Sequence, residues 1–274
     1  AGAVVPVSDG AMYLNGSDAE LTITDDSSLD FATGDFSICF WVNLLDVSAN
    51  ASKKILIKKG SDSSSANTGF TLQFHSNGTT LRSTFYDGDS GAHLEIANVF
   101  SNNDDYQWHH YAITFDRNVA MYAYKDGVLI GSDTDLASHV DSISNSDNIV
   151  IGKYSTNYLT GYMCNFGIFT SALTQPQIKS IMNKNYAGLT TGTGSESENL
   201  VSWWNLDSTI ATHTEGLTNV YDNHNITLGD NLCVNPIFDD ETGWVDSNIG
   251  ASDDVSLSQD YVKVGTNSLK VIGT

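Results

Sequence analysis

The sequence predicts an all-β protein whose antiparallel strands form a sandwich. From residue 11 to about residue 170, short alternating or apolar runs are separated by Gly, Asn, Asp and Ser. Aromatic and β-branched side chains, which favour strands, fill runs such as "FSICFWVNL". Many strands at this spacing are typical of a sandwich or barrel. The hydrophobic content of 40% is sufficient for a buried core.

Twelve runs are predicted to be strands, and one pair of them is joined by a sequence typical of a β-hairpin turn. Asp126-Gly127 in "YKDGVL" supplies the two positive φ angles of a type I′ turn. In chain order the runs are "AMYLNG", "AELTI", "FSICFWVNL", "KKILIKKG", "GFTLQFHS", "LRSTFYDG", "AHLEIANVF", "HHYAITFD", "AMYAYKDG", "GVLIGS", "NIVIGK" and "CNFGIFT".

One short helix is expected near residues 175–184. Thr174 begins "TQPQIKSIMNK", with Pro176 near the start and Gln177 three residues after Thr174, as in a capping box. Ile178, Ile181 and Met182 would form the apolar stripe that docks on the sandwich.

The sequence predicts three parts: a sandwich domain over residues 1–187, a linker with a short strand over 188–230, and the start of a second sandwich over 231–274. The segment "GLTTGTGSESEN" is typical of a linker, and "LVSWWNLDS" gives the short strand. Forty-odd residues cannot close a second sandwich by themselves. Residues 231–274 would either pack on another chain or belong to a longer polypeptide that continues beyond them, and we favour the second interpretation.

Charge and cysteine usage restrict the partners. Twelve Lys and Arg face 33 Asp and Glu, a net charge of −21. Such an acidic chain is not expected to bind nucleic acid, because phosphates would be repelled. No apolar run has the length of a membrane span, so no membrane insertion is expected. Three scattered cysteines, Cys39, Cys164 and Cys233, do not imply a disulfide framework.

The adjacent histidines His109 and His110, with Asp116 six residues after the second, resemble a fragment of an active site. They lie in a predicted strand, where successive side chains point to opposite faces. Two such histidines cannot converge on one metal or substrate atom. We therefore predict that they are residues of the sheet.

No other pattern indicates catalysis. Glycoside hydrolysis needs two carboxylates that face one groove. Asp133 and Asp135 in "GSDTDLAS" have a spacing of two, but they follow a hairpin and lack a third carboxylate. The chain has no nucleophile elbow, H-E-x-x-H, Walker loop or dinucleotide fingerprint. We therefore expect no enzymatic activity.

Two kinds of binding site remain from the residues alone. Asp87 and Asp89 in "YDGDSGAH" offer carboxylates on a turn that could hold calcium. Glycan binding needs exposed aromatic side chains, and the candidates in or beside loops are Tyr86, His93, Tyr106 and Trp108. For Trp41, Trp203, Trp204 and Trp244, in strand-like runs, core packing is expected.

Several separated motifs, in order, resemble one family. The run "YLNGSDAELTITDDSSLDFATGDFSICFWVNL" resembles the opening of the laminin-G-like, concanavalin A-like jelly rolls. "WHHYAITFD" followed by "YKDGVLIGS" is similar to their "W-H-H-V-A-V-T-Y-D … L-Y-V-D-G". "IGKYSTNYLTGYMCNFGIFTSALTQPQIKSIM" resembles their closing strand and docking helix. The resemblance covers residues 10–186 and implies a two-sheet jelly roll in which the histidine pair is a signature of the sheet.

The same resemblance implies positions for structural calcium. Asp18 and Asn165 match positions near the calcium of some relatives, but Cys164-Asn165 replaces the two carboxylates of the family's closing strand. "DNLCVNPIFDDETGW … GTNSLKV" resembles the first strands of galactose-binding-like carbohydrate-binding modules. In that segment Asp239 matches an acidic calcium ligand. Calcium, as a structural ion, is thus the cofactor that the sequence suggests.

Strings of such domains resemble marine phage tail-fibre, decoration or other virion proteins. The expected function is therefore a non-enzymatic structural or adhesion component of a virion or extracellular appendage, with glycan binding as a further property. The alternative is a secreted, calcium-supported, lectin-like module of a bacterial protein. The expected partners are copies of the chain or other virion or appendage subunits, and cell-surface glycans. The expected location is a virion surface or the extracellular space.

Overall fold

The protein is described by a computed structural model in which the chain divides into two compact units, Ala1–Asn225 and Ile226–Thr274. In the second unit only two strands are described. The described residues are 5–8, 10–45, 54–60, 68–75, 79–89, 91–100, 106–154, 156–190, 196–206, 254–258 and 268–272.

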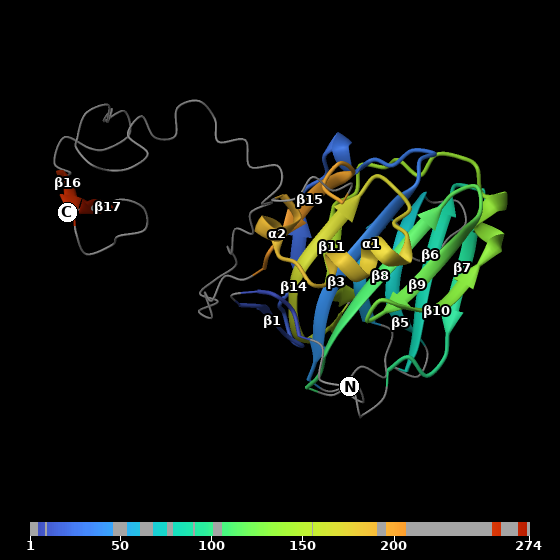
Figure 1. Ribbon diagram of the computed structural model, residues 1–274, viewed down its shortest axis with the longest axis horizontal. Helices are drawn as coiled ribbons and strands as arrows, with labels where there is room; N and C mark the ends of the chain where they lie inside the picture. Colours follow the sequence, from blue (N-terminus) through green and yellow to red (C-terminus); the bar gives the residue numbers. More distant parts are fainter. Residues whose placement is uncertain are drawn as a thin grey trace. The chain divides into compact units, whose positions relative to one another are not determined.

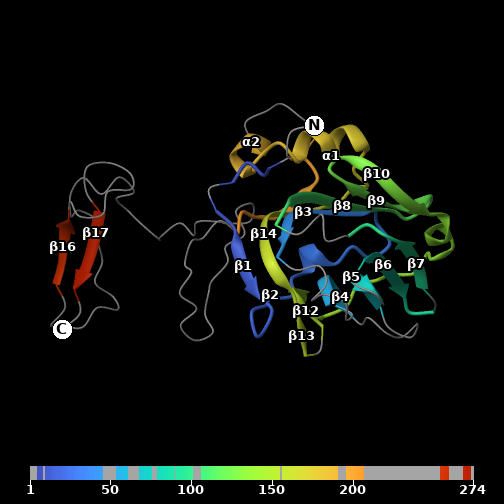
Figure 2. The ribbon, with the colours of Figure 1, turned by 90° about the horizontal axis from the view of Figure 1, so that it is seen from below.

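The first unit is a sandwich of two antiparallel sheets, as the sequence predicted (Figures 1 and 2). The larger sheet, sheet A, has the order β1-β14-β3-β8-β9-β10, and β15 also pairs with β14. Its strands are β1 (Met12–Asn15), β3 (Phe36–Leu44), β8 (Trp108–Asp116), β9 (Ala120–Lys125), β10 (Val128–Asp133), β14 (Thr160–Phe169) and β15 (Leu200–Trp204).

The smaller sheet, sheet B, faces sheet A across the core (Figure 2). Its order is β2-β11-β4-β5-β6-β7, and a separate two-stranded ribbon, β12 with β13, follows β11 in the chain. The strands are β2 (Leu21–Ile23), β4 (Lys54–Gly60), β5 (Thr68–His75), β6 (Thr80–Asp87), β7 (Gly91–Ile96), β11 (Ile149–Ile151), β12 (Lys153–Tyr154) and β13 (Asn157–Tyr158).

Stacked aromatic rings fill the space between the sheets. Phe36 of β3 stacks on Phe31, at 4.3 Å between ring centroids, and on Phe115 of β8, at 4.1 Å. Phe70 of sheet B reaches the same cluster, 5.2 Å from Phe36. Strand β3 is buried at every position except Asn43, because its alternate side chains face this core and a helix on the outside. That double burial explains why "FSICFWVNL" is apolar almost throughout.

The predicted helix is α1 (Gln175–Ile181), which lies on the outer face of sheet A (Figure 2). Thr174 and Gln177 form the expected capping box at its start. Ile178 and Ile181 pack with Tyr124 on an outer cluster of buried side chains. Among the described residues, the structure adds three short helical elements that the sequence did not indicate: α2 (Tyr186–Thr190) and the 3₁₀ turns η1 (Ser27–Leu29) and η4 (Thr134–Ser138).

The hairpin between β9 and β10 has the predicted turn. Asp126 and Gly127 have φ angles of 51° and 71°, the two positive values that type I′ requires. The turn also anchors the helix, since the Gln175 amide donates to the Gly127 carbonyl at 2.8 Å.

Two strands from distant parts of the chain share one edge of β14. Strand β1 pairs with residues 160–163, and β15 pairs with residues 166–169. Between them Asn165 adopts a positive φ of 49°, and its amide group donates to the Val7 carbonyl at 2.9 Å. The short strand expected within the 188–230 linker is thus β15, and it belongs to sheet A.

Strand β15 completes both layers of packing around sheet A. Trp204 faces the inter-sheet core, whereas Trp203 lies in the outer cluster beneath the helices. A Cβ on Gly167 would come within 2.6 Å of the Trp203 ring, so glycine at that position allows the ring to lie directly on β14. The predicted core role of both tryptophans, and of Trp41, is confirmed by their exposure of 1–4%.

The second unit contains an antiparallel pair, β16 (Asp254–Ser258) and β17 (Ser268–Ile272), in the register Asp254↔Ile272. Strand β17 overlaps "GTNSLKV", the run whose resemblance to carbohydrate-binding modules implied a strand. That residues 231–274 begin a second sandwich remains a prediction.

We expect Trp203→Ala to lower the free energy of unfolding of the first unit by about 3–5 kcal/mol, because it leaves a large cavity beneath the helices. Thermal or urea unfolding followed by circular dichroism measures the change. Val201→Ala, at a partly buried position of the same strand, should cost much less. Equal stability of Trp203→Ala and the parent protein would contradict the assignment of β15 to sheet A.

Candidate functional site

The histidine pair is part of the sheet, as predicted. His109 is opposite Val42 and His110 is opposite Trp41 in the pairing of β8 with β3, so their side chains take opposite faces. The His109 Nδ1 lies 2.7 Å from the Asp126 Oδ2, and the main-chain N–H of His110 donates to Oδ1 of the same carboxylate at 2.9 Å. The pair therefore fixes the β9–β10 turn and forms no catalytic group with Asp116.

Burial keeps His110 neutral. Its side chain is 1% exposed and lies edge-on to Trp41 at 5.4 Å. Desolvation lowers the pKa of His110 to about 3, against a smaller opposing effect of Asp126. At neutral pH the ring is therefore an uncharged packing group that solvent cannot reach.

Asp133 and Asp135, the two candidate catalytic carboxylates, take part in structural contacts. Asp133 caps η4 by accepting from the Asp135 N–H at 2.9 Å. Asp135 is largely exposed and lies 3.7 Å from the His139 Nε2. The Nδ1 of the same buried histidine lies 3.4 Å from Asp87, so Asp87 belongs to a polar cluster inside the protein.

Arg117 completes that polar cluster. Its guanidinium donates to the main-chain oxygens of His139 and Asp141, each at 2.8 Å. The group also lies over the Phe85 ring, 4.4 Å from its centroid. Asp87, predicted as a calcium ligand, is thus surrounded by cationic and aromatic groups.

The other predicted calcium ligands do not come together. Asp18 accepts from the Asn15 amide at 2.7 Å, beyond one end of β1. Asn165 lies past the other end of the β1 pairing, which runs from Asn15↔Thr160 to Met12↔Met163. Asp89 is exposed on the β6–β7 turn, and Asp239 lies outside the described residues.

Within the described ranges, no group of three or more His, Cys, Asp or Glu side chains could hold a metal ion. The four predicted ligands within these ranges, Asp18, Asp87, Asp89 and Asn165, belong to no such group, and calcium binding at each of the predicted places stays a prediction. Calcium support by Asp239 stays a prediction.

The four predicted glycan-binding residues separate into two pairs. Tyr86 of β6 and His93 of β7 meet edge-on at 5.4 Å. Tyr86 is only 8% exposed, and burial is the main cause that lowers the pKa of His93. This pair lies near η4, where β8 ends, whereas Tyr106 and Trp108 lie where β8 begins.

Tyr106 and Trp108 lie at the end of sheet A where β8 begins. Tyr106 is 72% exposed and adopts a positive φ of 62°. Its main-chain N–H donates to the Leu44 carbonyl at 2.8 Å, which ties it to the end of β3. Trp108 begins β8 and packs against the outer cluster of Trp41, Cys164 and Met182.

The strand register continues this end into a row across four strands. Tyr13 of β1 is opposite Tyr162 of β14, Tyr162 is opposite Asn43 of β3, and Asn43 is opposite Trp108. We call these four residues the aromatic row. Figure 1 shows their strands, β1, β14, β3 and β8, side by side.

The aromatic row faces outward, because the neighbouring residues along the strands face the core. Leu14, Val42 and Met163 all belong to the inter-sheet cluster, and side chains alternate along a strand. Tyr13 is 48% exposed, and its ring lies 5.0 Å from that of Tyr162. Three strand spacings make the row about 14 Å long.

The chemistry of the row is aromatic and uncharged. The Oδ1 of Asn43 is buried between its neighbours and has no hydrogen-bond partner among the described residues. The adjacent outward positions on β1 and β14 carry Ala11, Asn15 and Thr160, none of them charged. Aromatic rings on an outward face can pack against the apolar face of a ligand.

Of the four residues of the row, only Trp108 was predicted from the sequence as a binding residue, and its role stays a prediction. Tyr13 and Tyr162 lie inside strands, where core packing is the usual role of an aromatic residue. Asn43 also lies inside a strand, and it is not aromatic. Their shared outward face could be recognised only from the register that aligns β1, β14, β3 and β8.

Comparison with known families agrees with this architecture. The profile of the family Laminin_G_3, described as the concanavalin A-like lectin/glucanases superfamily, matches residues 15–179, more than half of the chain. The chain belongs to this family. The predicted jelly-roll resemblance over residues 10–186 is thereby confirmed. A search among curated proteins finds no match.

Solved structures share the fold at low sequence identity. The chain is similar to the botulinum neurotoxin serotype D binding domain, with a TM-score of 0.50 and 18% identity over 62% of this chain and 41% of that one. The binding domain of Paraclostridial Mosquitocidal Protein 1 gives a TM-score of 0.51 and 18% identity, over 65% and 46%. The chain thus spans less than half the length of either structure. These likenesses establish the fold.

No described helix has both the length and the apolar character needed to cross a membrane.

The neutral state of His110 predicts an acid-dependent loss of stability. The unfolded chain takes up this proton near pH 6.5, whereas the folded chain takes it up near pH 3. The stabilisation is therefore complete above pH 6.5 and is lost as the pH falls toward 3. We expect His110→Phe to reduce the difference in unfolding free energy between pH 7 and pH 4, measured with urea. His109→Gln is the matched control, and an equal acid sensitivity of His110→Phe and the parent would contradict the assignment.

Proposed function

We propose that this chain is a non-enzymatic carbohydrate-binding protein and that the aromatic row is its glycan-binding surface. The observation that carries the proposal is the alignment of Tyr13, Tyr162 and Trp108, with the amide of Asn43 between them, on one outward face. Aromatic side chains bind sugars because the apolar C–H face of a pyranose packs on a ring while the hydroxyl groups stay hydrated. The concanavalin A-like lectin fold of the chain supports the same proposal.

The shape of the row favours an extended ligand. A row of about 14 Å across four neighbouring strands offers contacts to several consecutive sugars. A deep pocket for one terminal sugar would instead need walls on several sides. We propose a linear polysaccharide or oligosaccharide as the ligand class.

The charge of the chain favours a neutral ligand. The net charge is −21, and Ala11, Asn15 and Thr160, the described outward positions beside Tyr13 and Tyr162, include no cation that could pair with a carboxylate or sulfate. A uronic acid, sialic acid or sulfated sugar would therefore meet repulsion at long range. We expect binding to neutral chains to exceed binding to anionic chains of the same length.

We further propose that the protein acts as an adhesion component on a virion surface or extracellular appendage. The family to which it belongs and its low content of cationic residues support a role in surface attachment. The alternative is a secreted lectin-like module with calcium support. A virion or appendage component should copurify with particles and oligomerise, whereas the secreted module should bind glycan as a monomer and lose affinity in EDTA.

Trp108→Ala and Tyr13→Ala should each weaken binding to a neutral oligosaccharide by about tenfold, because each removes a stacking surface. Isothermal titration calorimetry or affinity electrophoresis against a panel of neutral glycans measures the loss. Val119→Ala is the control, since Val119 has the same exposure as Tyr13 and lies on the β8–β9 turn. Unchanged affinity in both row variants would contradict the proposed surface. A change in oligomeric state alone, seen by sedimentation, would reassign the row to a subunit contact.

The absence of catalysis is tested on the same panel. We expect no release of reducing ends from any glycan that binds. Turnover that survives purification and disappears in Asp133→Asn or Asp135→Asn would overturn the non-enzymatic assignment.

A further inference from the structure

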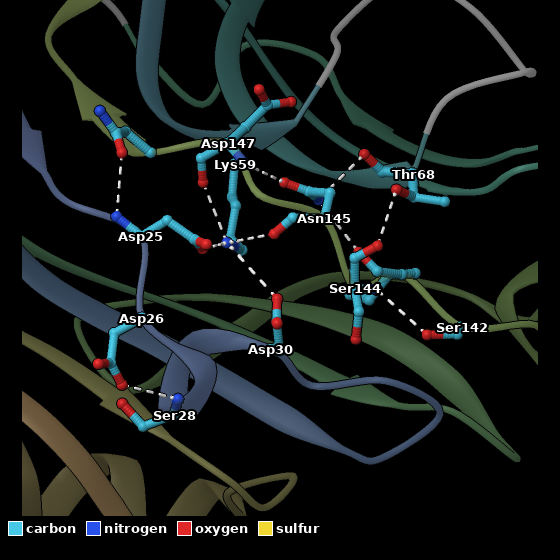
Figure 3. A network of polar contacts seen from close by, with 12 residues as sticks. Asp25, Asp26, Ser28, Asp30, Lys59, Thr68, Ser142, Ser144, Asn145 and Asp147 are labelled. Atoms are coloured by element: carbon cyan, nitrogen blue, oxygen red, sulfur yellow. Dashed lines mark hydrogen bonds and ion pairs between the residues drawn. The ribbon is translucent and has the colours of Figure 1, made fainter.

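Lys59 is a buried cation near the end of β4. The residue is 2% exposed, and its ammonium group meets oxygens from two loops (Figure 3). It pairs with the Asp25 carboxylate and donates to the main-chain oxygens of Asn145 and Asp147, each at 3.0 Å. These contacts join β4 to the segment after β2 and to the loop before β11.

The oxygens around Lys59 outnumber the hydrogens that it can donate. A lysine ammonium has three N–H groups, and the three contacts to Asp25, Asn145 and Asp147 use all of them. A fourth oxygen, Oδ1 of Asp30, lies 3.6 Å from the Lys59 Nζ. This atom is buried and has no hydrogen-bond partner in the described part of the chain.

The balance of charges around Lys59 favours a divalent ion over a single ammonium group. Asp25 and Asp30 together carry two negative charges, whereas the ammonium supplies one positive charge. A divalent cation would neutralise both carboxylates. Two carboxylate and two main-chain carbonyl oxygens around one point are the ligand types that calcium takes, with water completing the shell.

The oxygens are held in place by bonds that do not involve Lys59. The Asn145 side chain bonds to β5 and to the main chain of its own loop, and the main chain of Asp25 bonds to the Asn148 side chain. These bonds are Asp25 N–H to Asn148 Oδ1 at 3.0 Å, Asn145 Nδ2 to Ile143 O at 3.1 Å and to Thr68 O at 3.3 Å, Thr68 Oγ1 to Ser144 O at 3.3 Å, and Asp147 N–H to Asn145 Oδ1 at 3.0 Å.

We propose that the oxygens of Asp25, Asp30, Asn145 and Asp147 form a calcium-type cation site in which the ammonium of Lys59 is the resident cation. The loops around this site are therefore held without a metal ion in the protein as it exists. Removal of the amine opens the site to Ca²⁺. The site is distinct from the predicted calcium ligands, and the proposal does not depend on glycan binding.

The test is the effect of calcium on the thermal stability of the full chain carrying Lys59→Ala. We expect this variant to be less stable than the parent in EDTA. In about 10 mM CaCl₂ its Tm should rise by about 3–10 °C more than that of the parent at equal ionic strength. Calorimetry should detect Ca²⁺ binding to the variant that the parent lacks.

Two control variants isolate the site. Lys58→Ala removes the same charge from the neighbouring residue and should show no calcium response beyond that of the parent. The double variant Lys59→Ala/Asp30→Asn keeps the vacated space but lowers the negative charge, and it should lose most of the response. A folded Lys59→Ala whose Tm responds to calcium no more than the parent would overturn the proposal, as would an equal response of Lys58→Ala.

A second substitution covers the case in which Lys59→Ala does not fold in EDTA. Lys59→Met keeps an apolar side chain of similar length and loses only the amine. Recovery of folded Lys59→Ala on addition of Ca²⁺ would support the proposal. If Lys59→Ala stays unfolded in calcium and the Tm of Lys59→Met shows no calcium response, the proposal is wrong.

Discussion

The pairing of β14 is the constraint on which the rest of the first unit depends. Strand β14 bonds to β3 along one edge, and to β1 and β15 in succession along the other. Residues 12–15, 160–169 and 200–204 thereby meet in one sheet. Asn165, at a positive φ, lies where the two partners meet, and its main-chain N–H donates to Asn205 at 2.9 Å. This arrangement sets the register that aligns the aromatic row and places Trp203 beneath the helices.

Two buried cations hold loops in place, although the chain has a net charge of −21. Lys59 and Arg117 are 2% and 3% exposed, and both donate mainly to main-chain oxygens of loops. Buried charges are stable only when they are paired and hydrogen-bonded, and the surrounding aspartates supply the pairing. The loops at this end of the sandwich are therefore held by scarce positive charges, whereas the four residues of the aromatic row are uncharged.

The two ends of sheet A differ in the chemistry of their side chains. The carboxylates near η4 are engaged by His139 and by capping bonds. At the other end, strand register places Tyr13, Tyr162 and Trp108 on one outward face, where Tyr13 is 48% exposed. Side chains held on a sheet lose little conformational entropy when a ligand packs on them, which favours the glycan binding proposed above.

The sequence by itself determined the two-sheet fold, the capped helix, the type I′ turn at Asp126-Gly127 and the structural role of the histidine pair. These features follow from local rules: side-chain alternation, turn chemistry and capping act over a few residues. Only the tertiary structure decided that β15 joins sheet A, that Tyr13 and Tyr162 stand beside Trp108, and that Asp25 and Asp30 surround Lys59. Each of these contacts joins residues far apart in the chain, and strand order and register, which set them, leave no local signal in a single sequence.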